Sequence, residues 1–375
     1  MYTLSNTNKN GLIALGSIVI FSMIYMMPAR ATEESGWTIT KTDIFQPLTK
    51  RNVVIGSGDD VYLYHEKNPW LSHYRSGGKI SQIGRKGEGP GEFQLILRTM
   101  YSPQSKRLYV SSFPRLTHSH VFHQDGKLDE TIKFPDIQAV FPLKTIHGWV
   151  YLEIKDRSKL WLAGEHFAEA RKLLEWEEKS VEPKVSTDSL GIKLKRNLIK
   201  KGTYLEVSHD QEVFYFNRPG TFEILFFDAK NGTQYATYKG ENVAIPIDET
   251  WIEQETEKSQ KLFDKVDGGI IQLKSEVVAD YFPAVKRLVI GPQRSLLVYH
   301  ALHFVHEDAR PLILNKKGEE ISLPYSTPAL ERLVEVRGQW AWLMTFDNQE
   351  QEAGLIKLPV TAVDDYVRDH PILVE

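Results

Sequence analysis

A run of closely spaced histidines is the first group of residues in this chain whose types suggest chemistry. His118, His120 and His123 lie within six residues, and His118 and His120 share one face of a β-strand because side chains alternate. Imidazole nitrogen is a zinc ligand, so the pair suggests a metal site. His123 points to the other face of a regular strand, so the three do not converge locally. We favour the alternative, that they are surface histidines on a strand.

Acidic residues near predicted strand ends form a second group. They are Asp59, Asp60, Glu153, Asp156, Asp210 and Asp347. If these carboxylates lined one face of the molecule, they would suit a divalent cation such as calcium. Acidic residues are also common in turns and loops, where Asp bonds to its own backbone, and we expect that role. No Ser-His-Asp spacing stands out, and no G-x-S-x-G elbow is present.

A glycine-rich segment, residues 83–93 (IGRKGEGPGEF), invites a phosphate-binding interpretation. Its spacing fits neither G-x-G-x-x-G nor G-x-x-x-x-G-K-[ST], because Glu92 stands where a third glycine is needed and no Lys-Ser/Thr pair follows. Pro90 also removes a backbone donor. The segment therefore predicts a rigid, tightly folded connection between two strands.

Charge and cysteine content narrow the function classes. A basic run at 193–201 (KLKRNLIKK) can meet an anionic surface or ligand, but we expect a solvated connecting segment. The chain as a whole has a formal net charge of −3, and the −5 that remains after removal of residues 1–31 argues against a general nucleic-acid binder. It contains no cysteine, which excludes disulfides, thiolate metal sites, a cysteine nucleophile and a lipobox anchor.

The N-terminus has the features of a targeting segment. Lys9 precedes an apolar run from Gly11 to Met27, and Ala29 and Ala31 have the spacing of a signal-peptidase site. We expect cleavage after Ala31, with an uncleaved signal anchor as the alternative. Removal of residues 1–31 takes away Lys9 and Arg30, which leaves 44 basic against 49 acidic residues, a charge of −5. We therefore divide the chain into a signal peptide or anchor, 1–31, and one exported domain, 32–375.

The elements that must position these residues are short β-strands in a repeating order. Strong apolar runs occur at 61–64, 108–110, 149–152, 213–216, 295–299 and 339–343. Many are followed by a second strand and a glycine turn, such as the Asn231-Gly232 turn that suits a two-residue hairpin. The units recur at about 40 to 60 residues, which is the range of propeller blades. Between residues 53 and 360 the strands form about six units.

Three further segments complete the predicted layout. A helix is expected from about Asp248 to Val266, capped by Asp248 and ended by the glycines at 268 and 269. It would be an insertion on one edge of the ring. Residues 167–179 have a helical composition but the repeat position of a hairpin. The strand 37–45 is expected to complete the last blade and close the ring.

The glycine segment also carries a family resemblance. Residues 84–93 resemble the G-x-x-G-x-G-P-G-E/Q-F signature of NHL-type repeats, as found in exported bacterial six-bladed β-propeller proteins. Residues 281–284 (YFPA) are similar to a strand-opening element of that group. Ser111 and Ser112, then His118 or His120, stand where NHL repeats usually carry Asp and Arg. The resemblance covers residues 40 to 360 and implies that Phe93 fills the wedge between two blades.

These observations predict an all-β fold, a six-bladed β-propeller with one short helical insertion. The expected function is a non-catalytic scaffold for an unknown protein or small-molecule ligand, without nucleic acid and without a cofactor or assigned metal ligands. The protein would be periplasmic or secreted, and held at a membrane if the N-terminal segment is retained. The alternative is a metal-dependent hydrolase, lactonase or lyase with an axial calcium, because six-bladed lactonases place a metal on their axis.

Overall fold

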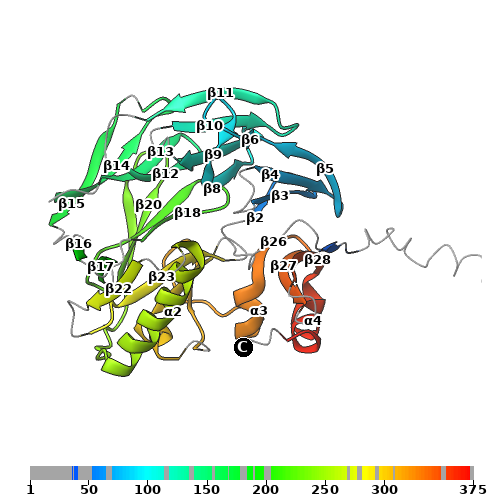
Figure 1. Ribbon diagram of the computed structural model, residues 1–375. Coiled ribbons are helices and arrows are strands. Elements are labelled where there is room, and N and C mark those ends of the chain that lie inside the picture. The colour runs from blue at the N-terminus through cyan, green and yellow to red at the C-terminus, as the bar shows by residue number, and fades with distance from the viewer. Residues whose placement is uncertain are drawn as a thin grey trace, which may run out of the picture.

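Six small antiparallel sheets stand in a ring and make up most of the molecule (Figure 1). This arrangement is a six-bladed β-propeller, as the sequence predicted. The computed structural model describes residues 36, 38–40, 53–64, 70–113, 118–134, 139–153, 157–167, 169–177, 184–188, 191–197, 204–267, 271–276, 281–291, 295–306, 309–347 and 352–371.

We number the blades in chain order and give their strands from the inner to the outer edge. The first three each have four strands. Blade 1 contains β2 (Val53–Ile55), β3 (Asp60–Tyr64), β4 (Leu71–Arg75) and β5 (Gly78–Ile83). Blade 2 contains β8 (Leu95–Ser102), β9 (Arg107–Phe113), β10 (His118–His123) and β11 (Leu128–Lys133). Blade 3 contains β12 (Ala139–Thr145), β13 (Gly148–Glu153), β14 (Arg157–Ala163) and β15 (Arg171–Glu177).

The last three blades differ from one another in how they are completed. Blade 4 contains β18 (Tyr204–Val207), β19 (Val213–Asn217), β20 (Glu223–Asp228) and β21 (Gln234–Lys239). In the described residues, blade 5 contains β23 (Val285–Ile290), β24 (Leu296–His300) and β25 (Leu312–Leu314). Blade 6 contains β26 (Leu333–Arg337), β27 (Trp340–Asp347), β28 (Glu352–Pro359) and, as its outer strand, β1 (Thr38–Thr40).

The second strand of every blade corresponds to one of the six apolar runs of the sequence. These strands are buried on both faces, as in β3 and β19, where each residue is buried. A strand with a neighbouring blade on each side needs apolar residues at successive positions rather than in alternation. This explains why continuous apolar runs in the sequence indicated the positions of the blades better than alternating apolar and polar residues did.

Apolar side chains fill the space between each pair of adjacent blades. One cluster joins blades 1 and 2 around Phe93, and another joins blades 3 and 4 around Phe214. The remaining interfaces have clusters of the same kind. The cluster with Val53 and Trp342 joins blade 6 to blade 1, so the first and last blades are neighbours (Figure 1). The core is therefore a closed ring of six interfaces.

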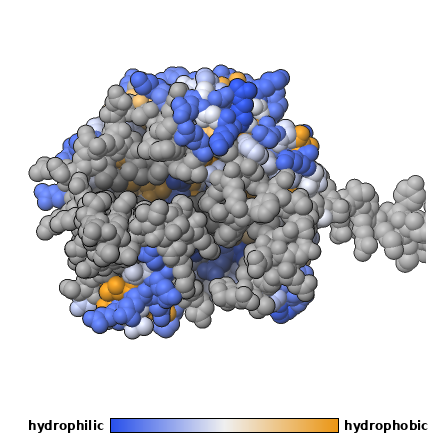
Figure 2. Space-filling model, viewed as in Figure 1, coloured by the Kyte–Doolittle hydropathy of each residue, from blue (hydrophilic) through white to orange (hydrophobic). Residues whose placement is uncertain are grey.

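The described surface is mainly hydrophilic on the side seen in Figure 2, and its hydrophobic areas are small and separate. Large apolar side chains that are exposed come from several different parts of the described chain. They are Ile80, Leu128, Tyr235, Val243, Tyr281 and Val305. The apolar side chains of the described blades are thus used mostly between the blades.

The predicted ring closure is confirmed. Strand β1 pairs antiparallel with β28, with Thr38 opposite Ile356 and Thr40 opposite Gly354. Ile39 is buried in the cluster between blades 6 and 1. An N-terminal strand thus completes the C-terminal blade.

The glycine segment forms the joint between blades 1 and 2, as predicted. Strands β6 (Arg85–Lys86) and β7 (Glu92–Phe93) form a small parallel pair between β5 and β8. Phe93 is fully buried between the two blades. Oε2 of Glu92 accepts the N–H of Gly89 at 2.9 Å, so this carboxylate stabilises the turn.

Each blade has turns on two opposite faces of the ring. The turns that join first to second strands, and third to fourth strands, lie at the same end of an antiparallel sheet, because strand direction alternates. We call the face that bears them the hairpin face. The glycine turns at Gly77, Gly126, Gly232 and Gly318 all have positive φ and belong to it.

The helical content exceeds the single predicted insertion. Helix α2 (Glu249–Asp267) confirms the expected one, and the Asp248 carboxylate accepts the N–H of Trp251 at 2.7 Å as its cap. Two shorter helices, α3 (Thr327–Arg332) and α4 (Val363–Asp369), were not predicted and pack against the blade 5–blade 6 core. Residues 171–177 form strand β15. These residues therefore have the strand structure expected from their position in the repeat, and not the helix that the composition of 167–179 favoured.

A small extra sheet also lies outside the predicted repeats. It contains β16 (Lys184–Asp188), β17 (Gly191–Asn197) and β22 (Ile271–Glu276), with β17 and β22 parallel. The predicted basic run therefore begins in a strand, β17, and continues beyond the described residues. No described helix is long and apolar enough to cross a membrane. The predicted signal segment lies outside the described residues.

Candidate functional site

The predicted acidic residues do not gather on one face. Asp59, Asp60 and Asp210 lie at first turns, on the hairpin face, whereas Glu153 ends β13 and Asp347 ends β27, at the opposite face. Asp156 lies outside the described residues. No group of three or more His, Asp or Glu side chains with metal-site geometry occurs in the described part of the chain.

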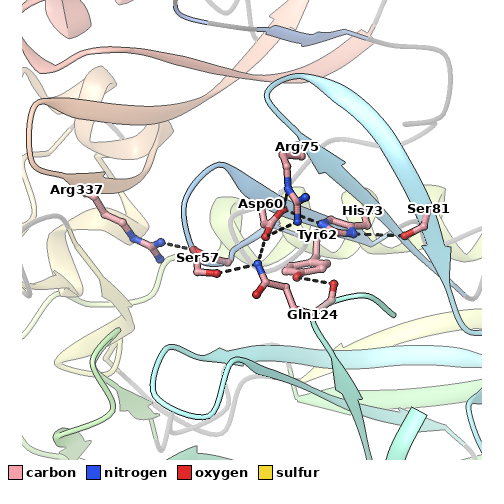
Figure 3. Close-up of polar contacts among 9 residues, drawn as sticks. Ser57, Asp60, Tyr62, His73, Arg75, Ser81, Gln124 and Arg337 are labelled. Carbon is pink, nitrogen blue, oxygen red and sulfur yellow. Dashed lines mark hydrogen bonds and ion pairs between the residues drawn. The ribbon is translucent and has the colours of Figure 1, made fainter. Parts of the chain in front are cut away.

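Asp60 is the centre of a buried polar network in blade 1 (Figure 3). Its Oδ1 lies 3.0 Å from Nε2 of His73 and accepts Nε of Arg75 at 2.7 Å. The side-chain amide of Gln124, from the glycine turn of blade 2, donates to Oδ2. Burial raises the pKa of Asp60, but the hydrogen bonds from Arg75, His73 and Gln124 outweigh it and hold this pKa below the ordinary value of 3.8.

Blade 6 reaches the same turn from the other side. Nζ of Lys357 lies 2.7 Å from Oδ1 of Asp59, and the ammonium group stands 4.5 Å from the ring centre of Trp340. The guanidinium of Arg337 donates to the carbonyl oxygens of Ile55 and Gly56. The turn at 56–60 is thus held by polar side chains from both neighbouring blades, and we call this group of contacts the seam.

The seam includes a serine, a histidine and an aspartate in contact. Oγ of Ser81 lies 3.4 Å from Nδ1 of His73, which contacts Asp60 through its other nitrogen. The three are aligned because Ser81 and His73 are register partners on β5 and β4. Sequence spacing did not reveal this trio. The His73 and Asp60 side chains are each only 2% exposed, so this trio is buried within the blade and is not open to solvent.

Two of the three histidines that were weighed as metal ligands, His120 and His123, point to different surroundings. His120 is buried, contrary to the expected surface position, and its Nδ1 lies 3.1 Å from Oγ1 of Thr131 and 3.4 Å from the Gly91 nitrogen, which donates to it. His123 points outward, with Nε2 3.2 Å from the Asp129 carboxylate. His120 therefore supports the glycine joint. Because side chains alternate along β10, the His120 ring faces Phe93, with 5.4 Å between the ring centres.

A cleft of about 360 Å³ opens on the hairpin face between blades 3, 4 and 5. Its walls are turns and strand ends, so side chains from three blades converge on it. The lining residues are Ile146, His147, Glu212, Val213, Asp228, Lys230, Tyr235, Lys316 and Lys317. Ligand pockets occupy about 300–1,000 Å³, so this cleft suits a small ligand.

The blade 4 wall of the cleft is a rigid turn. Oδ1 of Asp228 accepts the N–H groups of Lys230 and Asn231 at 2.8 and 3.1 Å. Oδ1 of Asn231 accepts the N–H of Thr233 at 2.8 Å. These bonds fix the backbone from which the Lys230 side chain projects.

The blade 5 wall is fixed in the same way. Oδ1 of Asn315 accepts the N–H groups of Lys317 and Glu319 at 2.8 and 3.1 Å. The phenol of Tyr235, from blade 4, donates to the carbonyl oxygen of Lys316 at 2.7 Å and so joins the two walls. Burial, with the charges of Asp228 and Asp210, raises the pKa of Tyr235 to about 12, so this phenol keeps its proton at neutral pH.

The ammonium groups of the cleft form no ion pair in the described part of the molecule. Lys230, Lys316 and Lys317 are exposed, and no described carboxylate pairs with any of them. The sequence analysis did not single out these lysines, although Lys230 precedes the Asn231-Gly232 turn and Lys316 and Lys317 precede Gly318. Their equivalent positions in consecutive repeats were the available signal, since equivalent turns lie on one face.

Comparison with known proteins gives structural likenesses alone. No family model matches the chain, and no curated protein matches its sequence. A "putative exported protein" of Bacteroides fragilis NCTC 9343 is similar with a TM-score of 0.47 and 11% identity, over 87% of this chain and 94% of that one. A DUF4221 member from Bacteroides vulgatus ATCC 8482 has a TM-score of 0.46 and 8% identity, over 87% and 96%.

A more distant likeness is to a streptogramin B lyase, with a TM-score of 0.41 and 9% identity over 85% of this chain and 96% of that one. These likenesses do not indicate what the present chain binds. The NHL-type resemblance of residues 84–93 likewise stays an expectation, because no family model matches.

Proposed function

We propose that this protein is an exported, non-catalytic scaffold that binds a small ligand in the cleft between blades 3, 4 and 5. The observation that carries the proposal is the presence, on two rigid turns, of three ammonium groups that form no ion pair with a described carboxylate, those of Lys230, Lys316 and Lys317. Lysines that protrude from fixed backbone lose little backbone freedom when a ligand binds, which favours binding.

The composition of the cleft supports binding more than catalysis. Its lining contains no serine or threonine among the described residues, and the chain has no cysteine to act as a nucleophile. The carboxylate of Asp228 is already occupied by two backbone N–H groups of its own turn. The raised pKa of Tyr235 makes its phenolate rare near neutral pH.

The alternative is a metal-dependent hydrolase, lactonase or lyase with an axial site and calcium. An axial site would be lined by the inner strands of the blades. One carboxylate on these strands is that of Glu206, on β18, and its Oε2 lies 2.8 Å from Nη2 of Arg98, on β8. A carboxylate held by a guanidinium is a poor start for a cation site unless the pair opens. Calcium would have to open the Arg98–Glu206 pair in order to bind Glu206, so the alternative can be tested by adding calcium.

A ligand screen with site readout separates the two functions. We expect compounds that raise the melting temperature to protect Lys230, Lys316 and Lys317 from acetylation, measured by mass spectrometry, with Lys127 in the blade 2 turn unchanged. Stabilisation should not depend on calcium or chelator. Turnover of a lactone or ester that requires calcium would instead establish the alternative, and hits without lysine protection would exclude the cleft.

Export is part of the same proposal. It rests on the apolar run 11–27 and the Ala29-x-Ala31 site. N-terminal sequencing of the exported protein should begin at Thr32. An intact Met1 in a membrane fraction would instead show a protein tethered by its N-terminal segment.

A further inference from the structure

Three lysines and two carboxylates line the cleft, and the blade 5 turn contributes two of the lysines. Lys316 and Lys317 come from the blade 5 turn, Lys230 and Asp228 come from the turn between β20 and β21 of blade 4, and Glu212 lies at the first turn of blade 4. An anionic group near the lysines would gain favourable charge interactions, which are stronger in a partly enclosed site than in bulk water. A second anion near Glu212 or Asp228 would be repelled.

The apolar part of the cleft is equally specific. Tyr235 is 45% exposed although its ring is held in place by the hydrogen bond to the Lys316 carbonyl and by contact with Phe226, 6.4 Å between ring centres. A fixed, exposed aromatic face binds planar rings by stacking and the C–H faces of sugars by dispersion. Ile146 and Val213 add apolar surface to the same cleft.

These two features stand next to each other, because Tyr235 is bonded to the backbone of Lys316. A group that rests on the Tyr235 ring is therefore adjacent to the turn that carries Lys316 and Lys317. The volume of about 360 Å³ leaves room for one ring and its substituents rather than for a polymer segment.

We infer that the cleft binds a single carboxylate attached to a ring, with the ring on Tyr235 and the carboxylate at Lys316 and Lys317. The inference rests on the proposed function and gives its ligand a chemical class. Two classes of compound share this chemistry, namely sugar acids and aromatic acids. Both place one negative charge beside one flat or C–H-lined face.

Calorimetric titration tests the class with defined probes. Glucuronate and 4-hydroxybenzoate represent the two sources, glucose and 4-hydroxybenzyl alcohol are their neutral counterparts, and acetate is the carboxylate without a ring. We expect at least one ring carboxylate to bind at least tenfold more tightly than its neutral counterpart and than acetate. Its affinity should fall as salt increases. The source follows from which of the two acids binds.

Matched variants link the binding to the cleft. The double variant Lys316→Gln/Lys317→Gln and the variant Tyr235→Leu should each lower the affinity at least tenfold, while Lys127→Gln in the blade 2 turn leaves it unchanged. All four positions are exposed, and thermal melts should show that each variant folds.

The outcomes distinguish this inference from the proposed function. Neutral compounds that bind as tightly as the acids, with protection of the cleft lysines, would overturn the ligand class and leave the binding function intact. Binding of a different chemical class in the screen, with no binding of either acid, would do the same. Failure of every compound to protect these lysines would contradict both.

Discussion

Nε2 of His73 lies 3.0 Å from Oδ1 of Asp60, and both side chains are almost completely buried at the seam of the ring. The pair belongs to blade 1, but its other partners extend to blade 2 through Gln124. Lys357 and Arg337 hold the same turn from blade 6. The seam therefore combines the apolar contacts of two interfaces with polar contacts that have defined geometry.

Replacement of Asp60 by Asn should destabilise the protein by roughly 1–3 kcal/mol, because it removes charged hydrogen bonds and leaves buried donors unpaired. Urea unfolding measures this change. Asp365→Asn is the matched control, since Asp365 pairs with Arg368 at an exposed site and should cost less than about 0.5 kcal/mol. Equal effects of the two variants would contradict a stabilising role for the seam.

The contribution of Asp60 should disappear in acid. Its folded-state pKa lies below its ordinary value of 3.8, so the stabilisation is fully present above the unfolded-state pKa and is lost as pH falls through the folded-state pKa. The difference in unfolding free energy between wild type and Asp60→Asn should be constant from about pH 5 to 7 and shrink below about pH 4. The same difference at pH 3 and pH 7 would show that the carboxylate charge is irrelevant.

Phe93→Ala should cost about 3–5 kcal/mol, because it empties a fully buried wedge between blades 1 and 2. Thermal and urea unfolding give the value. Ile80→Ala serves as a control on the neighbouring outer strand, since Ile80 is 55% exposed and should change stability little. A Phe93 variant as stable as this control would remove the wedge interpretation.

Alanine substitutions at two glycines with positive φ distinguish the cost of backbone strain from the cost of steric overlap. Gly338 has a φ of 58°, and no described atom lies within 4 Å of the position that a Cβ would take, so Gly338→Ala should cost about 1–2 kcal/mol from strain alone. Gly84 has a φ of 79°, and a Cβ there would overlap the ring of Phe93. Gly84→Ala should therefore cost more than Gly338→Ala in urea unfolding. Equal costs would mean that Phe93 can move freely.

The sequence predicted the repeating features of the fold well, because each rests on local patterns. Apolar runs located the second strands, and glycine turns located the hairpins. Helix α3 was missed although Ser326 caps it and accepts from the Ala329 N–H at 3.4 Å, because a six-residue helix has little periodicity. The parallel pairing of β17 with β22 was beyond prediction, since all of blade 4 lies between them in sequence.

The candidate cleft was harder to predict than the fold. Lys230 and Lys316 were visible as turn residues, but only the curvature of the ring brings the turns of blades 4 and 5 around Tyr235. The contacts of the seam were equally hard to predict from the sequence. Alternation places Tyr62 and His73 on one face of their sheet, with ring centres 4.7 Å apart, yet the arrival of Gln124 depends on how blade 2 packs.

The pairing of β1 with β28 has a consequence for the order of events during synthesis. Thr38 is among the first residues of the domain to be made, and its partner Ile356 is among the last. Contacts between such distant residues form late, because the entropy of closing so long a loop must be overcome first. A nascent chain would therefore leave Val53 and Ile55 without their blade 6 neighbours. Until the final strands arrive, these apolar edges are exposed and favour aggregation.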